Sequence, residues 1–260
     1  MPLPHETGAV CVGRERIAVA GFAEVRLLDR GGAQSGALVA GAFTKALAEV
    51  GGCLCAASDD GTLRAWSVDD LAPCASAELG VGARVAVAMD GSLVVGVADG
   101  TVHRWRVGGD VERLGALKHP QAVSGIARAG SLLATASLAR SVRLSDPETG
   151  ARVAVFDRLR SLPWALAAAP DGRTVAVAVG HAIERFEVPT LRNLGPWKEH
   201  RALVSALLWC EEGLWSGAED GTVIVRDAAG RAQRTLAGRG RVTALAGDGA
   251  VVCVARAPKR

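Results

Sequence analysis

The clearest pattern along the chain is a short apolar segment, a tight turn and a second segment in which apolar and polar residues alternate. Around Asp60, the apolar run Cys53–Ala57 is followed by Asp-Asp-Gly and then by Thr62–Ser67. Asp-Gly between two such segments is typical of a β-hairpin, because glycine supplies the positive φ that tight hairpin turns require. The pattern recurs at Asp99 and Asp220. The chain is therefore predicted to be rich in short antiparallel strands.

The hairpin pattern returns at a regular interval. Weaker copies align with the strong ones, and consecutive copies are separated by 38, 39, 40, 41 and 40 residues. The six aligned turn positions are Phe22, Asp60, Asp99, Ala139, Gly180 and Asp220. A period near 40 residues indicates a repeat architecture in which each repeat forms one small sheet that packs against its neighbours.

This repeat resembles that of the WD-repeat (Trp-Asp repeat) β-propellers. The dipeptide that names the family corresponds here to Leu28-Asp29, Trp66-Ser67, Trp105-Arg106, Ser145-Asp146, Phe186-Glu187 and Arg226-Asp227. The family's hydrogen-bonded tetrad of His, Ser or Thr, Asp and Trp is represented in the second copy by Ser58, Asp60 and Trp66. His119 and His200 occupy the histidine position ahead of the fourth and sixth copies. His119 lacks the matching Asp and Trp, and His200 lacks the Ser and Trp.

The resemblance implies an all-β fold with a single domain over residues 1–260. This is a β-propeller with six four-stranded blades and a partial seventh, arranged as a seven-bladed ring. The strands expected in the first blade are Ala9–Val12, Ile17–Ala20, Val25–Leu28 and Gly36–Ala40, and the second begins with Ala46–Val50. The seventh blade is expected to contain only two strands, Val242–Ala246 and Val251–Ala255. In this family N-terminal residues usually supply the outer strand of the last blade, but Met1–Gly8 is short and contains two prolines, which disfavour a strand. The sequence leaves the closure of the ring open.

Composition excludes few functions. Hydrophobic residues make up 49% of the 260 residues, and the net charge of +3 is too small to indicate a nucleic-acid or membrane partner. No apolar run approaches the roughly 18 residues of a membrane helix, and the N-terminus lacks the pattern of a secretory signal. We therefore expect a cytoplasmic protein. Abundant Ala, Gly, Val and Arg beside few Lys suggest a GC-rich, bacterial genome.

The cysteines and histidines give no sign of catalysis. The six cysteines, at positions 11, 53, 55, 74, 210 and 253, show no zinc-like spacing. Cys53 and Cys55 alternate onto one face of a strand, so the cysteines are predicted to be buried free thiols, with a redox or metal site as the less favoured alternative. The five histidines are scattered one to a blade, and no nucleophile with a base can be assembled. The expected protein is not an enzyme and has no catalytic residue, cofactor or metal.

Charge is expected to be unequal on the two faces of the propeller. In this family, the turns between second and third strands and the connections between blades share one face, which we call the loop face. Trp and Arg, the residue types that dominate binding hot spots, concentrate in the loop-face segments of the fourth to sixth blades. The predicted partner-binding residues are Arg140, Arg158, Arg160, Trp164, His181, Lys198, Arg201 and Arg241. The opposite face should collect acids with few bases, namely Asp69, Asp70, Asp90, Asp110, Glu148, Asp171, Glu211, Glu212 and Asp248. An ordinary solvated surface is the alternative interpretation.

From the resemblance we predict a non-catalytic protein–protein interaction module or scaffold subunit. Its protein partner would dock on the basic loop face and could also cover the incomplete last blade. Two alternatives stay open. A small ligand or substrate could bind in the central channel, although the inner strands offer only Glu49 and Arg84 as charged groups. Nucleic acid could bind the loop-face arginines, and binding would then weaken steeply with salt.

Overall fold

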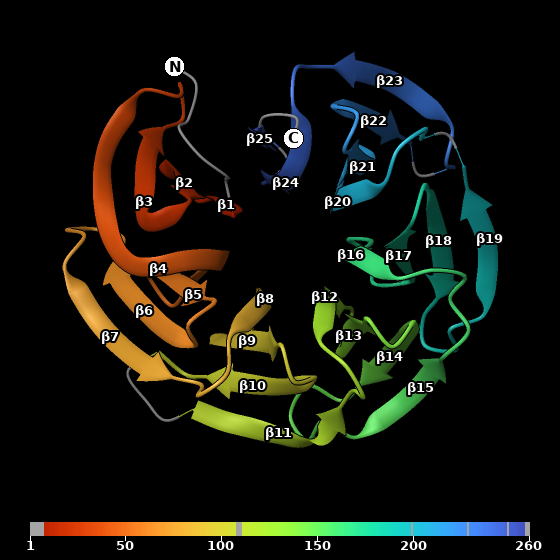
Figure 1. Cartoon of the computed structure of the whole chain (residues 1–260), viewed down its shortest axis with the longest axis horizontal. Coiled ribbons are helices and arrows are strands. Elements are labelled where there is room, and N and C mark those ends of the chain that lie inside the picture. Colours follow the sequence, from red (N-terminus) through yellow and green to blue (C-terminus); the bar gives the residue numbers. More distant parts are fainter. Residues whose placement is uncertain (1–7, 108–110, 199, 228, 249, 258–260) are drawn as a thin grey trace.

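The structure is a computed structural model that describes residues 8–107, 111–198, 200–227, 229–248 and 250–257. All secondary structure in these residues is β-strand, and the strands form radial sheets around a central channel (Figure 1). Each sheet is a meander in which successive strands pair antiparallel. The strand nearest the channel begins a blade and the strand at the rim ends it.

The first two blades share one sheet. Blade 1 contains β1 (Ala9–Val12), β2 (Arg16–Ala20), β3 (Phe22–Asp29) and the first part of β4 (Gln34–Val50). Blade 2 contains the rest of β4, β5 (Cys53–Ser58), β6 (Thr62–Ser67) and β7 (Pro73–Glu78).

Blades 3 to 6 are separate four-stranded sheets. Blade 3 comprises β8 (Ala83–Met89), β9 (Ser92–Val97), β10 (Thr101–Trp105) and β11 (Val111–Lys118). Blade 4 comprises β12 (Val123–Ala129), β13 (Leu132–Ser137), β14 (Ser141–Ser145) and β15 (Arg152–Phe156). Blade 5 comprises β16 (Pro163–Ala168), β17 (Thr174–Val179), β18 (Ala182–Glu187) and β19 (Asn193–Trp197). Blade 6 comprises β20 (Val204–Cys210), β21 (Gly213–Ala218), β22 (Thr222–Arg226) and β23 (Ala232–Ala237).

The long strand β4 departs from the sequence-based prediction of two strands, Gly36–Ala40 and Ala46–Val50. The segment between them keeps its pairing, because Phe43 pairs with Phe22 on β3 and Thr44 pairs with Ser58 on β5. Gly41 has a φ of +81° and bends the strand without ending it. No proline, aspartate or asparagine interrupts this segment, so nothing forces a loop. One strand is therefore both the rim of blade 1 and the inner strand of blade 2.

The core lies between the blades. Trp66, Trp105 and Phe186, at the third-strand position where the family carries its Trp, are all buried. Trp66 packs with Leu27 and Leu54, and the other two aromatic rings occupy the corresponding apolar layers of later blades. Burial of such large apolar side chains is the main favourable contribution to packing blade against blade.

The ring ends in a two-stranded seventh blade, as predicted, with β24 (Arg241–Gly247) and β25 (Val252–Ala257). Strand β1 lies beside β24 across the seam without joining its sheet (Figure 1). Arg30 also bridges the seam, donating to the Asp248 carboxylate at 2.7 Å and to the Gly13 carbonyl at 2.8 Å. The bond from Arg30 holds the pKa of Asp248 well below its usual range. The ring thus closes by packing and an ion pair, and the prediction about Met1–Gly8 lies outside the described residues except at Gly8.

Candidate partner-docking face

The connection between blades 4 and 5 presents two cations around one apolar anchor. Leu159 is only 3% exposed and packs in the core between these blades, whereas Arg158 and Arg160 on either side are exposed. The Leu159 N–H donates to the carbonyl of Arg140 at 3.1 Å. This bond ties the connection to the β13–β14 turn, where the exposed Arg140 adopts a φ of +59°. Arg140, Arg158 and Arg160 therefore belong to one basic cluster. Asp157 lies 3.8 Å from Arg158 in an exposed pair, which is worth little.

The connection between blades 5 and 6 is built in the same way around a buried histidine. His200 is 7% exposed and contacts Ser216 on β21, with 2.7 Å between Nε2 and Oγ. The next residue, Arg201, is exposed, and its carbonyl accepts a 3.0 Å hydrogen bond from Nδ1 of the exposed His181. This bond joins the β17–β18 turn to the connection, so His181 and Arg201 lie together. Lys198 is exposed just before this anchor.

The two tryptophans beside these connections differ. Trp197 is half-buried, with the guanidinium carbons of Arg185 and Arg226 at 4.3 Å and 5.5 Å from the ring centroid. This stacking gives it a structural role between blades 5 and 6. Trp164 is 42% exposed at the start of β16, where it lines the central channel. Arg84 and Lys45 line the same channel.

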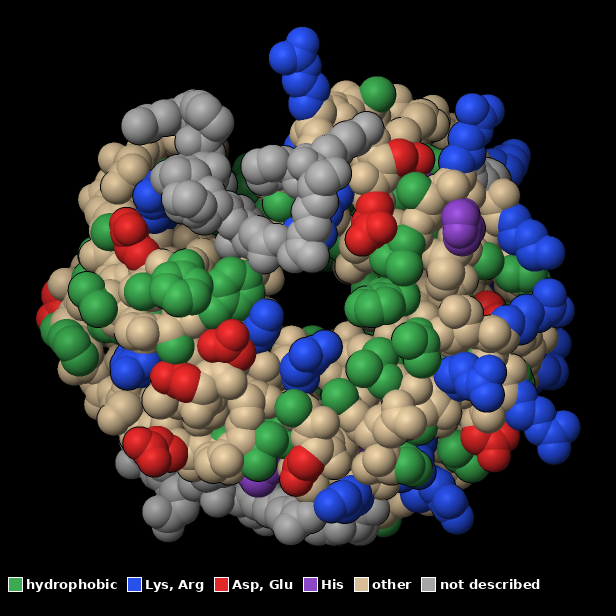
Figure 2. Space-filling view, viewed as in Figure 1, with side chains coloured by type: hydrophobic (Ala, Val, Ile, Leu, Met, Phe, Trp, Pro, Cys, Tyr) green, Lys and Arg blue, Asp and Glu red, His purple; other side chains and the backbone are tan. Residues whose placement is uncertain are grey.

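The structure thus brings only some of the predicted site residues close together. The structure joins Arg140, Arg158 and Arg160 in one cluster and His181 with Arg201 in a second, and Trp164 lies toward the channel. Arg241 is half-buried as the first residue of β24. Figure 2 shows Lys and Arg side chains gathered along the rim over β15, β19 and β23, with hydrophobic side chains around the central opening.

Sequence reasoning missed one apolar member of this surface. Leu162 is 38% exposed in the blade 4–5 connection, two residues before Trp164. The buried residues of this segment are Leu159 and Pro163, so Leu162 does not follow the spacing of the anchors. The burial of Leu159 and Pro163 is known only from the structure, so the sequence carried no signal that singled out Leu162.

The comparisons with known proteins concern the fold. No family model and no curated protein sequence matches the chain. The crystal structure of the WD40 β-propeller domain of Doa1 matches with a TM-score of 0.85 and 15% sequence identity, covering 98% of this chain and 91% of that one. The chain has the WD40 β-propeller fold. The computationally designed protein Ika8 matches with a TM-score of 0.77 and 21% identity, covering 96% of this chain and 80% of that chain. WD40 propellers are commonly protein-interaction scaffolds, but a fold by itself assigns no partner.

The hydrogen-bond network of this WD40 propeller differs from the predicted tetrad. His119, fully buried, contacts Thr135 at 2.8 Å, just as His200 contacts Ser216. The strand pairing places Ala56 at the equivalent position of blade 2, two residues before Ser58. The assignment of Ser58 to a tetrad was therefore wrong. The statement that His200 lacks its serine was wrong as well.

At the family's Trp position, blade 6 carries a fully buried arginine. Arg226 Nη1 donates to the Ser216 hydroxyl at 3.0 Å, the contact through which it joins the network around His200. Burial, together with the charge of Arg143, lowers the pKa of His119 to about 3. His119 therefore holds its blade connection as a neutral group.

The turn aspartates of the loop face are structural. Asp60, Asp99 and Asp220 each accept hydrogen bonds from the backbone N–H and the hydroxyl of the threonine two residues later, at 2.6–2.9 Å. Each of these carboxylates thereby stabilises its own turn.

The opposite face is less acidic than predicted, because arginines reach its carboxylates. The observed ion pairs are Arg128–Asp90, Arg104–Glu148, Arg234–Glu212 and Arg30–Asp248, each at 2.7–2.9 Å. The expectation of few bases on this face was wrong, since strand and loop arginines that the prediction did not count pair with these four acids. Asp110 lies outside the described residues.

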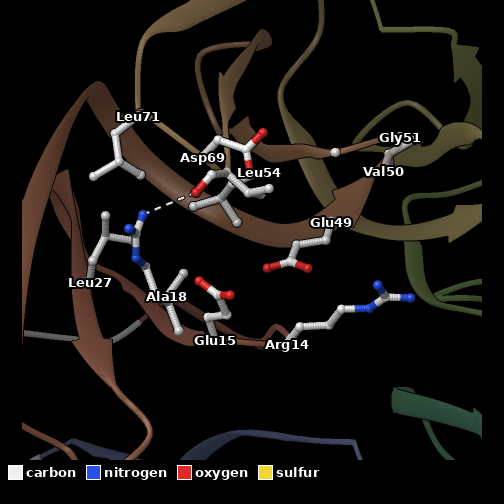
Figure 3. Close-up of a pocket in the computed structure, with 13 residues that line it drawn as sticks. Arg14, Glu15, Ala18, Leu27, Glu49, Val50, Gly51, Leu54, Asp69 and Leu71 are labelled. Atoms are coloured by element: carbon white, nitrogen blue, oxygen red, sulfur yellow. Dashed lines mark hydrogen bonds between the residues drawn. The ribbon is translucent and has the colours of Figure 1, made fainter.

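Two of the hollows lined by the described residues are candidate ligand sites. The central channel, of about 700 Å³, is lined mainly by Ala, Val, Leu, Ser and Gly of the inner strands. A cleft of about 520 Å³ opens between blades 1 and 2 on the face opposite the loop face. Its floor is apolar at Leu27, Leu54 and Leu71, and in Figure 3 the carboxylates of Glu15 and Glu49 point into the same space.

The part of the chain that the structure describes meets the requirements of neither a membrane helix nor a metal cluster. The described residues contain no helix long and apolar enough to span a membrane. Across the same part of the chain, no three His, Cys, Asp or Glu side chains are placed to share a metal ion.

Proposed function

We propose that residues 1–260 act as a single-domain, non-catalytic interaction module whose protein partner docks on the loop face of blades 4 to 6. The observation that carries this proposal is the pair of blade connections in which buried Leu159 and His200 hold exposed cations outward. An anchored loop loses little conformational entropy when a partner binds it.

The composition of this surface fits a protein partner. Arg158, Arg160 and Arg201 can form charge-assisted bonds with carboxylates, and Trp164 with Leu162 offers exposed apolar area beside them. Aromatic and Arg anchors next to apolar contacts are typical of binding hot spots. An acidic partner segment with apolar residues matches this surface.

Charge reversal tests the proposal. The variant R158E/R160E/R201E is expected to weaken partner capture from native cell extract at least about 100-fold, because each Arg hot spot is worth about 1–2 kcal/mol or more. The matched control is R14E/R152E/R173E, which reverses three exposed arginines away from the blade connections and changes the net charge equally. Quantitative mass spectrometry compares the captured proteins after nuclease treatment. Equal capture by the two variants would refute docking at this face, and capture lost on nuclease treatment would favour nucleic acid.

A second candidate surface for the partner is the edge of the seventh blade. Within the described residues, β25 pairs with β24 alone, so its outer edge has backbone N–H and C=O groups available for another strand. Such an edge accepts an added strand through main-chain hydrogen bonds. Amides of Val252–Ala257 should exchange faster than those of Gly213–Ala218 in the isolated protein, and slow when the partner is added. Unchanged exchange in the complex would exclude strand addition.

A further inference from the structure

The cysteines are not all buried, contrary to the sequence-based prediction. Cys55 and Cys210 are buried, but Cys74 is exposed on β7 and Cys53 is half-buried on β5. The Sγ atoms of Cys53 and Cys74 lie 3.0 Å apart. This contact brings together two thiols that are 21 residues apart, and one of them is open to solvent.

A bulge in blade 2 explains why two strands separated by β6 can bring their sulfurs together. Trp66 on β6 pairs with Pro73 and Ala65 pairs with Ala75, which leaves Cys74 as the extra residue. Cys53 pairs with Ser67 at the end of β6, where the side chain is small. The Ser67 hydroxyl accepts a hydrogen bond from the N–H of Asp69 at 3.3 Å. The two thiols therefore meet across the end of β6.

We propose that Cys53 and Cys74 are a reversible oxidation site that forms a disulfide when the protein meets a hydroperoxide. The Cys74 sulfur attacks the peroxide, the O–O bond breaks, and Cys74 sulfenic acid and water are formed. The Cys53 sulfur then displaces the sulfenic hydroxyl group, which leaves as a second water. In sum, two thiols lose two hydrogens and hydrogen peroxide becomes two waters.

The environments of the two thiols set this order. Cys74 is exposed and meets the oxidant first. Burial and the hydrogen bond with Cys74 raise the pKa of Cys53 to about 11, so Cys53 does not compete with Cys74 for the peroxide, and its sulfur 3.0 Å from that of Cys74 makes it the resolving thiol. Burial raises the pKa of Cys55 to about 12, and its Sγ faces the Cys53 carbonyl at 3.9 Å. Cys55 is therefore a poor competitor.

Closing the bond requires a small shift of β7. The sulfurs must approach from 3.0 Å to about 2.05 Å. Strand β7 is the rim strand of blade 2, pairs within the described residues only with β6, and is exposed at alternate positions. A rim strand that already contains a bulge can move by this amount with little loss of packing.

The cross-link would lie on the blade 3 side of the blade 2 sheet, because Cys53 packs against the apolar cluster between blades 2 and 3, whereas Leu54 packs toward blade 1. Gly52 and Leu54 flank Cys53 in sequence and line the cleft, and the Val68 N–H donates to the Gly52 carbonyl at 3.0 Å. A disulfide between β5 and β7 would hold this wall of the cleft in one position. The oxidation site is thus connected to the cleft shown in Figure 3 through the backbone on either side of Cys53.

Peptide mapping tests the proposal on the full chain. After treatment with hydrogen peroxide and trypsin, residues 46–64 and 65–84 should appear as one linked species, two hydrogens lighter than the sum of the two peptides, and dithiothreitol should separate them. Cys53→Ser and Cys74→Ser should abolish the link, while the matched control Cys55→Ser retains it. A link that survives Cys53→Ser, or wild-type Cys74 that passes to sulfinic acid without any link, would overturn the proposal.

A second measurement guards against loss of folding in the variants. In Cys53→Ser the sulfenic acid on Cys74 has no resolving thiol, so it should persist and add dimedone at several times the wild-type yield. Equal dimedone addition in wild type and variant would show that Cys53 does not resolve the sulfenic acid, and would also overturn the proposal.

Discussion

The loop face is built in two ways, and the contrast separates blades 4 to 6 from blades 1 and 2. In blades 4 to 6, connections leave the sheets and return through a buried anchor, which leaves their arginines exposed. Between blades 1 and 2, the continuous strand β4 replaces the connection, and the surface there is apolar. Phe22 is 75% exposed, and the Lys45 ammonium lies 4.2 Å from the ring centroid of Phe43. In this propeller, the exposed arginines of the loop face are thus held by connections that leave the sheets, whereas the continuous strand presents apolar side chains and Lys45.

The largest expected effect comes from removing the anchor of the basic connection. Leu159→Ala should lower the free energy of unfolding by about 2–5 kcal/mol, because a buried leucine leaves a cavity. The matched control Leu162→Ala, on an exposed side chain of the same connection, should cost below about 1 kcal/mol. Denaturant titration of both variants measures the difference. Equal costs would mean that Leu159 does not anchor the connection.

Acid should destabilise the histidine-anchored blades. The pKa of His119 is lowered to about 3 in the folded protein, so the unfolded chain binds the extra proton first as pH falls below about 6.5. The contribution of His119 to stability should fall by up to about 1.4 kcal/mol per pH unit between these two values, and it is fully present above pH 6.5. His119→Gln should have a shallower acid slope than the wild type in urea titrations from pH 7 to pH 4.5. Parallel slopes would contradict a neutral anchor.

A smaller change in stability is expected between blades 1 and 2, at the bend of β4. Gly41 has a φ of +81°, where a side chain costs about 1–2 kcal/mol. The added Cβ would lie 3.2 Å from the Arg64 guanidinium, which can move aside. Gly41→Ala should therefore lower stability by about 1–2 kcal/mol, as measured by thermal unfolding. Gly36→Ala on the same strand, with ordinary φ and room for a methyl group, is the control and should change stability by less than about 0.5 kcal/mol.

The sequence predicted what depends on local chemistry and repetition. Asp-Gly-Thr turns recur at a regular interval, and each turn supplies the hydrogen-bond donors for its own aspartate. The positions of the strands and the number of blades could therefore be predicted from the sequence. The continuity of β4 was missed because a single glycine can either end a strand or bend it. Which of the two happens at Gly41 depends on the pairing of the flanking residues with β3 and β5. The Ser216–His200 contact was missed because it joins the connection before blade 6 to the second strand of that blade, and the register of β21 sets which residue meets the histidine.

The candidate site was predictable in type but not in arrangement. Arg158, Arg160 and Arg201 were identified from composition and from the face implied by the repeat. Their division into two clusters depends on backbone bonds from Leu159 and to the Arg201 carbonyl, which leave no mark in the sequence. The bases of the opposite face were missed for the same reason, since the arginines that pair with its acids come from neighbouring strands or blades.

The most direct test of docking on the loop face of blades 4 to 6 is a hydrogen-exchange footprint of the partner complex. The account predicts that amides of residues 157–162 and 200–203 become protected on binding, while those of residues 21–24 and 41–45 keep their exchange rates. Protection confined to residues 21–24 and 41–45, with the blade 4–5 and 5–6 connections unchanged, would contradict it.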